Sequence, residues 1–180
     1  MSINIMATNL TIDESLVNDN NDITALPAPI STALTNLSLN TTSDTGFPQY
    51  AYKDGFVSVQ AMDGESITGL TFRQLVNGEY VTFSKTIGVE TDFHLTGSTD
   101  TIYLFATDDP NVIVGRVGGP TGDVAFAIVL QVEMTGSQVT GADAYIVQYA
   151  SLDHPTGGDS HDEEIDLSGL VYVAALGRRR

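Results

Sequence analysis

Val124-Ala-Phe-Ala-Ile-Val-Leu130 is apolar at every position, and this stretch decides the predicted fold. A strand with one solvated face alternates apolar and polar residues, so an unbroken apolar run requires cover on both faces. A buried helix segment could also have this composition. Two observations favour a strand: the apolar run itself contains β-branched residues, and it follows a glycine-rich segment, Gly118-Gly-Pro-Thr-Gly-Asp123. We therefore expect a central strand of a packed β-structure.

Short apolar or alternating runs separated by turn residues continue on both sides of this strand. The clearest turn is Asn77-Gly78, which lies between two alternating runs and suits a two-residue type I′ hairpin, where both central residues need positive φ. About nine short strands with regularly spaced turns predict an all-β, antiparallel β-sandwich with Ig-like or Greek-key connections over residues 46–177. A jelly roll is the second choice.

The segment before this region is predicted to be an extended N-terminal arm, residues 1–45. Its Asn18-Asp-Asn-Asn-Asp22 is a loop sequence, and Pro27 and Pro29 favour an extended backbone. Residues 178–180, three arginines, form a basic tail. The predicted organisation is therefore arm, sandwich domain and tail.

The charge of the chain is strongly negative. Its 180 residues include 23 Asp and Glu against 7 Lys and Arg, for a net charge of −16, and three of the seven bases are in the basic tail. Such a surface repels phosphate backbones and anionic lipid headgroups, so we expect no nucleic-acid partner. Because 42% of the residues are apolar, the chain is expected to fold rather than remain disordered.

Cysteine is absent, which excludes disulfides, thiolate metal sites and a cysteine nucleophile. The first residues show neither a basic flank nor an apolar run typical of a secretory leader. The longest apolar run falls far short of the roughly 20 residues that a membrane span needs, so no membrane insertion is expected.

The densest polar cluster is the acidic loop 153–166, which holds six carboxylates and the two histidines His154 and His161. Calcium prefers six to eight oxygen ligands, which such a loop could provide. The candidate calcium ligands are Asp153, Asp159, Asp162, Glu163 and Asp166. Zinc held by the two histidines is an alternative, and a solvated acidic loop without metal is another. The EF-hand pattern is absent from this loop.

An enzyme is not expected, because the sequence has no nucleophile elbow, zinc-protease motif or phosphate-binding loop. Arg116 interrupts an apolar strand and could be a functional base, although such a residue usually clamps a carboxylate across strands. Tyr50, Tyr52, Tyr145 and Tyr149 could form a glycan-binding face, although tyrosines at this spacing usually pack against a sheet.

The chain resembles a repeat domain of unknown function that occurs in tandem in RTX-type, type I-secreted bacterial adhesins and toxins. The resemblance covers nearly the whole chain and is strongest from Tyr103 onward. It is carried by Leu10-Thr-Ile-Asp-Glu-Ser15, Ile102-Tyr-Leu-Phe105, Val114-Gly-Arg-Val-Gly118, Val124-Ala-Phe-Ala-Ile128, Gln148-Tyr-Ala-Ser-Leu-Asp-His-Pro155 and Ile165-Asp-Leu-Ser-Gly-Leu-Val-Tyr172. It implies a non-enzymatic β-sandwich in extracellular fibres, often in calcium-bearing surroundings. Such domains usually continue into a further strand after the last one found here.

Two functions follow as expectations. The first is a structural or adhesive subunit of an extracellular surface assembly, which joins copies by strand exchange at an open sheet edge and is stabilised by calcium. The alternative is a surface protein of a bacteriophage virion, either decoration or tail. The expected partners are further copies or another surface protein, with a glycan or host-surface ligand as an option. The basic tail is a candidate dock for a neighbour's acidic surface.

Overall fold

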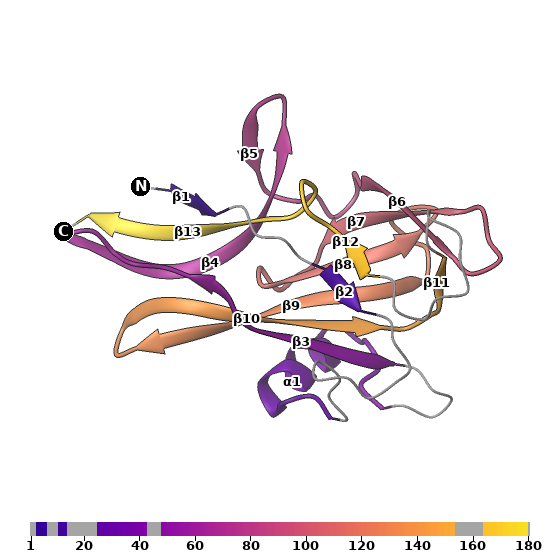
Figure 1. Ribbon diagram of the computed structural model, residues 1–180, viewed down its shortest axis with the longest axis horizontal. Coiled ribbons are helices and arrows are strands. Elements are labelled where there is room, and N and C mark those ends of the chain that lie inside the picture. The colour runs from indigo at the N-terminus through magenta and orange to yellow at the C-terminus, as the bar shows by residue number, and fades with distance from the viewer. Residues whose placement is uncertain (1–2, 7–10, 14–24, 43–47, 154–163, 180) are drawn as a thin grey trace.

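The computed structural model describes residues 3–6, 11–13, 25–42, 48–153 and 164–179. Within them the chain forms one helix and thirteen strands, and every pair of neighbouring strands is antiparallel. Figure 1 shows their arrangement. No helix in this part of the chain has the length and apolarity of a membrane span.

The larger sheet has seven strands in the order β11-β6-β7-β8-β9-β10-β3. These strands are β3 (Gln49–Ser58), β6 (Val89–Leu95), β7 (Thr101–Ala106), β8 (Val112–Val117), β9 (Val124–Thr135), β10 (Gln138–Gln148) and β11 (Leu152–Asp153). The apolar run 124–130 opens β9, which lies between β8 and β10, and residues 125–130 are all buried. The prediction of a central strand covered on both faces is therefore confirmed.

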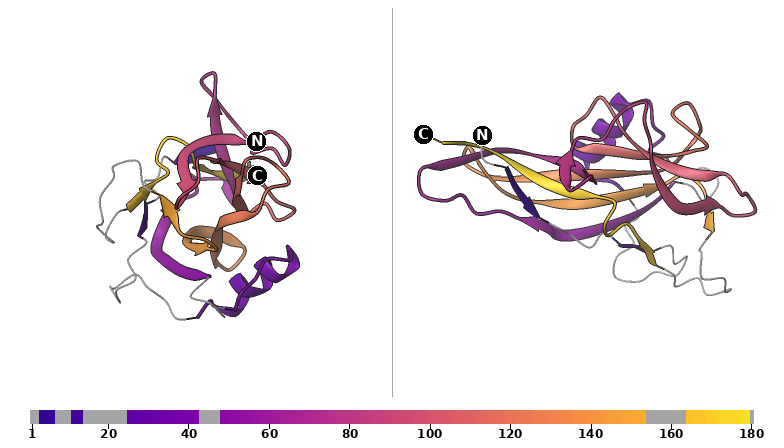
Figure 2. Two further views of the ribbon diagram at one scale, coloured as in Figure 1. Left: turned by 90° about the vertical axis from the view of Figure 1, so that its right-hand side faces the viewer. Right: turned by 90° about the horizontal axis from the view of Figure 1, so that it is seen from above.

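A smaller sheet of four strands lies over one face of the larger one, in the order β1-β13-β4-β5. Its strands are β1 (Ile3–Met6), β4 (Glu65–Val76), β5 (Glu79–Val81) and β13 (Tyr172–Arg179). The prediction of a basic tail from residue 178 is wrong for Arg178 and Arg179, which pair with β4, and Arg180 lies outside the described residues. Phe72 of β4 and Val173 of β13 join Phe126 and Ile128 of β9 in one apolar cluster. Viewed along the long axis of the molecule, the strands surround this core (Figure 2). The predicted antiparallel all-β class is confirmed, while the exact sandwich topology stays a prediction.

The opposite face of the larger sheet is covered by helix α1 (Ala28–Asn36). Ile30 and Leu34, one turn apart on the helix, are buried with Ala127 and Val129 of β9 in a second apolar cluster. Alternate residues of β9 therefore point into two different cores. This is why its sequence has no polar positions between the apolar ones.

The prediction that residues 1–45 form an extended arm is wrong for residues 28–36, which are helical. Pro27 is the residue before the helix and Pro29 lies in its first turn, where the backbone N–H groups have no partner within the helix. The two prolines thus begin the helix rather than preventing it. In the same segment, β1 and β2 (Thr11–Asp13) are extended, but they pair with β13 and β12 (Glu164–Asp166) of their own chain.

The hairpin of β4 and β5 confirms the turn prediction. Asn77 and Gly78 have φ values of 51° and 84°, as a type I′ turn requires. Figure 1 shows the tip of this hairpin projecting beyond the rest of the smaller sheet. Its tip lies on the side of the molecule opposite α1, which the end-on view of Figure 2 also shows.

Candidate functional site

The predicted calcium ligands lie mostly outside the described residues: Asp159, Asp162 and Glu163 do, as do both histidines of the loop. Asp153 is exposed at the end of β11, opposite His94 of β6. Asp166 lies in β12, opposite Thr11 of β2, and so belongs to a different sheet. Among the described residues, no three histidine or acidic side chains gather as a metal site would require. Calcium in this loop therefore stays a prediction.

Tyr50, Tyr52, Tyr145 and Tyr149, called here the tyrosine cluster, belong to the core beneath α1. Tyr145 is only 6% exposed, and its ring centroid lies 4.9 Å from that of Tyr52. The hydroxyl of Tyr50 donates a hydrogen bond to the carbonyl oxygen of Thr41 at 2.8 Å. The interpretation of these tyrosines as packing residues is therefore confirmed.

Two carboxylates flank the hydroxyl of Tyr52 at an irregular point of the sheet. Tyr52 Oη lies 3.0 Å from Asp54 Oδ1 and 3.4 Å from Asp143 Oδ2. Asp143 is 9% exposed and also accepts a hydrogen bond from the backbone N–H of Gly55 at 2.8 Å. Burial, followed by these two carboxylates, raises the pKa of Tyr52 well above 10. The hydroxyl therefore stays protonated and can donate at neutral pH.

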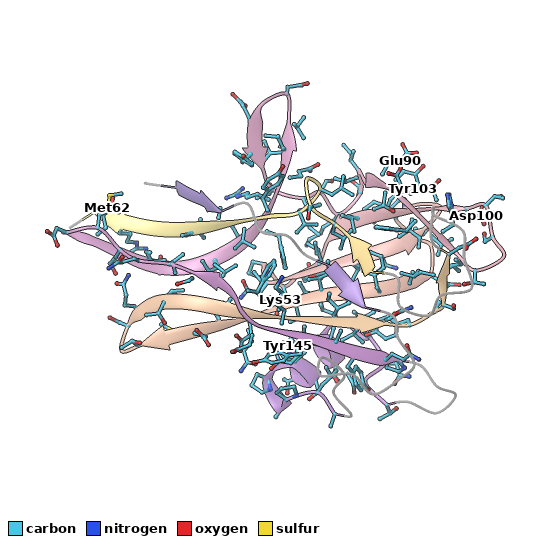
Figure 3. The ribbon with its side chains drawn as sticks, in the orientation of Figure 1. Lys53, Met62, Glu90, Asp100, Tyr103 and Tyr145 are labelled. Carbon is cyan, nitrogen blue, oxygen red and sulfur yellow. The ribbon has the colours of Figure 1, made fainter. Side chains whose placement is uncertain are left out.

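This arrangement fixes a bulge in β3. Residue Lys53 faces Ala144 of β10 and Val57 faces Ala142, so β3 carries extra residues at this point. Gly55 lies within the bulge at a φ of 58°, which favours glycine. Figure 3 shows Lys53 on the face of β3 turned towards the smaller sheet, whereas Tyr145 lies on the α1 side. Asp143 thus has a structural role, because its carboxylate replaces the strand partner that the bulge removes from Gly55.

An open pocket of about 350 Å³ lies between the end of α1 and strands β7 and β8. Its lining combines aliphatic side chains with two basic residues, Lys85 and Arg116. Lys85 is paired with Asp108 at the pocket. The pocket, which we call the Arg116 pocket, is a concave surface that an apolar group with a negative charge would complement.

Arg116 does not clamp a carboxylate among the described residues. Its Nη1 donates instead to the carbonyl oxygen of Gly122 at 2.8 Å, which uses one of the five N–H donors of the guanidinium. Gly122 is close enough to β8 that a Cβ there would lie 1.8 Å from the carbonyl oxygen of Val117. The 118–123 loop therefore folds back on the strand and holds the guanidinium at the pocket. The sequence marked Arg116 as unusual, but nothing in it indicated that the helix would form the other wall.

Comparison with known proteins identifies a family but no characterised relative. The family model described as "Domain of unknown function (DUF5801)" matches residues 9–176. No curated protein and no solved structure matches the chain. Because the match extends from before β2 into β13, it includes both cores and the Arg116 pocket. The chain belongs to the DUF5801 family of domains of unknown function.

Proposed function

We propose that this chain is a non-enzymatic structural or adhesive module of an extracellular surface assembly, in which copies join by exchange of the N-terminal strand. The observation that carries the proposal is the closure of one sheet edge. The outer edge of β13 is covered only by β1 within the described residues, over the four pairs from Ile3↔Leu176 to Met6↔Val173.

An uncovered strand edge presents unpaired N–H and C=O groups, which natural proteins pair or shield. Strand β1 provides that cover in its own chain, and the same segment of a second copy could form the same four pairs in the same register. Exchange would then retain the hydrogen bonds while linking copies. The resemblance to tandem domains of RTX-type adhesins supports the extracellular setting of the proposal.

The test uses the absence of cysteine, since any disulfide must come from introduced residues. Asn4 lies opposite Ala175 in the β1–β13 pair, so Asn4→Cys with Ala175→Cys reports which copy supplies the strand. We expect disulfide-linked multimers on a non-reducing gel after oxidation at high protein concentration. Disulfides formed only within single chains at every concentration would refute strand exchange.

A matched control is the pair Thr135→Cys and Gln138→Cys, which face each other across the tight turn joining β9 and β10. These residues are too close in sequence to exchange without opening the sheet, so this pair should link only within a chain. Antibody labelling of intact cells and of purified virions would separate the adhesin setting from the virion alternative. A location inside the cell and absent from virions would refute both settings.

Calcium is the proposed stabilising ion, bound by the acidic loop 153–166. A ligand that binds only the folded state raises the melting temperature, by an amount set by its concentration relative to Kd. Millimolar Ca²⁺ should raise the melting temperature relative to chelator, with Mg²⁺ as a control. Asp159→Asn with Asp162→Asn should remove that rise. Equal melting temperatures in Ca²⁺ and chelator would refute calcium binding.

A further inference from the structure

The tip of the β4–β5 hairpin exposes apolar side chains on a projecting element. Leu75, Val76 and Tyr80 are 44%, 42% and 38% exposed, and they lie within six consecutive residues. Large apolar side chains gathered on a protruding surface are typical of a contact site for a partner.

The two faces of this tip differ. Leu75 lies opposite Tyr80 on one face, and the ring of Tyr80 contacts that of Tyr172 of β13 edge-on, with centroids 5.0 Å apart. This contact supports the hairpin from the body. Val76 lies opposite Glu79 on the other face, where an apolar side chain stands beside an exposed carboxylate.

The Arg116 pocket has the complementary chemistry. The partly exposed Leu37 and Leu39 give it an aliphatic wall above the buried Val114, and Arg116 places a cation beside them. Asp108, which also lines the pocket, is paired with Lys85. Within the described residues no carboxylate pairs with Arg116, so its charge is available to a partner's acid. A guanidinium binds a carboxylate through two parallel hydrogen bonds, which gives direction as well as attraction.

We propose that the hairpin tip of one copy inserts into the Arg116 pocket of a second copy, with Val76 against the aliphatic wall and Glu79 against Arg116. The hairpin and α1, which forms one wall of the pocket, lie on opposite sides of the molecule (Figures 1 and 2). A chain therefore cannot fill its own pocket. The contact joins two different surfaces and so leaves one of each free on a pair of copies, which lets further copies add until they close a ring or form an open chain.

This inference rests on the proposed function, because it supplies a second contact for the same assembly. The two contacts use different residues: strand exchange uses the β1–β13 edge, whereas this contact uses the hairpin and the pocket. A single small contact is weak in solution, and it becomes effective when copies are already held close together. The hairpin contact also fixes which surfaces of two copies face each other, because the negatively charged surfaces elsewhere repel one another.

Charge reversal tests the contact without any need to identify a ligand. Glu79→Arg and Arg116→Glu are made separately, and self-association is measured by sedimentation velocity over a range of protein concentrations. Each variant alone brings like charges together and should weaken association about tenfold or more. An equimolar mixture of the two should recover association to near the wild-type level, because each tip then meets a pocket of opposite charge.

The mixture also controls for folding, since a misfolded Arg116→Glu protein could not be rescued by its partner. Asp92→Arg, an equal charge change at an exposed position of β6, should associate at least as well as the wild type. Val76→Asp is a further variant, which should weaken association while leaving both charges of the proposed pair in place. Loss of association in both charge variants with no recovery in the mixture would overturn the pairing.

The outcome is distinguishable from that of strand exchange. If the wild type and both charge variants associate equally, the hairpin contact is refuted, while multimers linked through the Asn4–Ala175 cysteine pair would still support exchange. If the mixture recovers association but the cysteine pair links only within chains, the hairpin contact stands and exchange fails. A wild type that stays monomeric at every concentration refutes both.

Discussion

Gly115 gives the sharpest test of how the first core is packed. It lies opposite Phe126 in the β8–β9 register, and a Cβ at this position would lie 2.5 Å from Cε1 of Phe126 and 3.0 Å from Cγ2 of Ile102. Both of these side chains are fully buried. Inserting a methyl group into a filled core costs about 1–3 kcal/mol, and the smaller entropy of the unfolded alanine chain returns about 0.4–1 kcal/mol. Gly115→Ala should therefore lower the free energy of unfolding by about 1 kcal/mol, and by no more than about 2.6 kcal/mol.

The measurement is urea denaturation followed by circular dichroism, with an unchanged m-value as evidence that only stability has changed. Gly69→Ala is the matched control, because a Cβ at that strand position meets only Leu176 Cδ1 at 3.9 Å. It should leave stability unchanged or raise it by up to about 1 kcal/mol. Combining Gly115→Ala with Phe126→Leu removes the clashing ring atoms, so the cost of the alanine should largely disappear in that background. An equal cost of Gly115→Ala with Phe and with Leu at position 126 would refute the reasoning.

Three further predictions concern the helix, the bulge and the tyrosines. Leu34→Ala should destabilise the protein by about 2–5 kcal/mol, whereas Thr32→Ala on the exposed side of α1 should change stability by less than about 0.5 kcal/mol; equal effects in denaturation would contradict the position of the helix. Asp143→Ala should lower the free energy of unfolding by about 1–3 kcal/mol, because it leaves the backbone N–H of Gly55 without its acceptor. Asp54→Ala, at an exposed position, should lower it much less. The reverse order would contradict the assigned roles. Because burial raises the pKa of each member of the tyrosine cluster above the ordinary 10.0, the folded state holds these protons more tightly than the unfolded state. The contribution of these four tyrosines to the free energy of unfolding is therefore complete below pH 10 and is lost as the pH rises above it. Tyrosinate absorbance of the cluster at 295 nm should grow together with loss of the far-ultraviolet circular dichroism signal. Ionisation of the cluster at pH 10 with the fold intact would contradict its burial.

The parts of the fold that depend on neighbouring residues could be predicted from the sequence. The run 124–130 indicates its own burial, and Asn77-Gly78 indicates its own turn, because each structure is decided by residues within a few positions. The sequence does not predict the helix, because prolines occur both in the first turn of helices and in extended segments. Only the burial of Ile30 and Leu34 against a distant sheet makes nine residues helical, since so short a helix is marginal by itself.

The candidate sites were predicted less well, because they depend on pairings between distant segments. Asp143 contacts Gly55 across 88 positions of the chain, and that contact arises from the register shift between β10 and β3. The Arg116 pocket needs the end of α1 beside β8, and no local pattern places the helix there. Arg116 was singled out correctly as a charge in an apolar strand. Its partner, a glycine carbonyl, could not be identified from residue types, because every residue has a carbonyl oxygen.

The pairing of β1 with β13 has a mechanical consequence. Ile3, at the start of β1, lies opposite Leu176 near the end of β13, so the two strands leave the sheet at the same end of the molecule. A force that pulls Ile3 and Leu176 apart would load the β1–β13 hydrogen bonds one after another, from this end of the pair, rather than all together in shear. The four pairs should therefore separate at low force while the seven-stranded sheet stays intact. Pulling would bare the edge of β13, which is the edge that the proposed strand exchange uses, so force on the chain should promote that exchange.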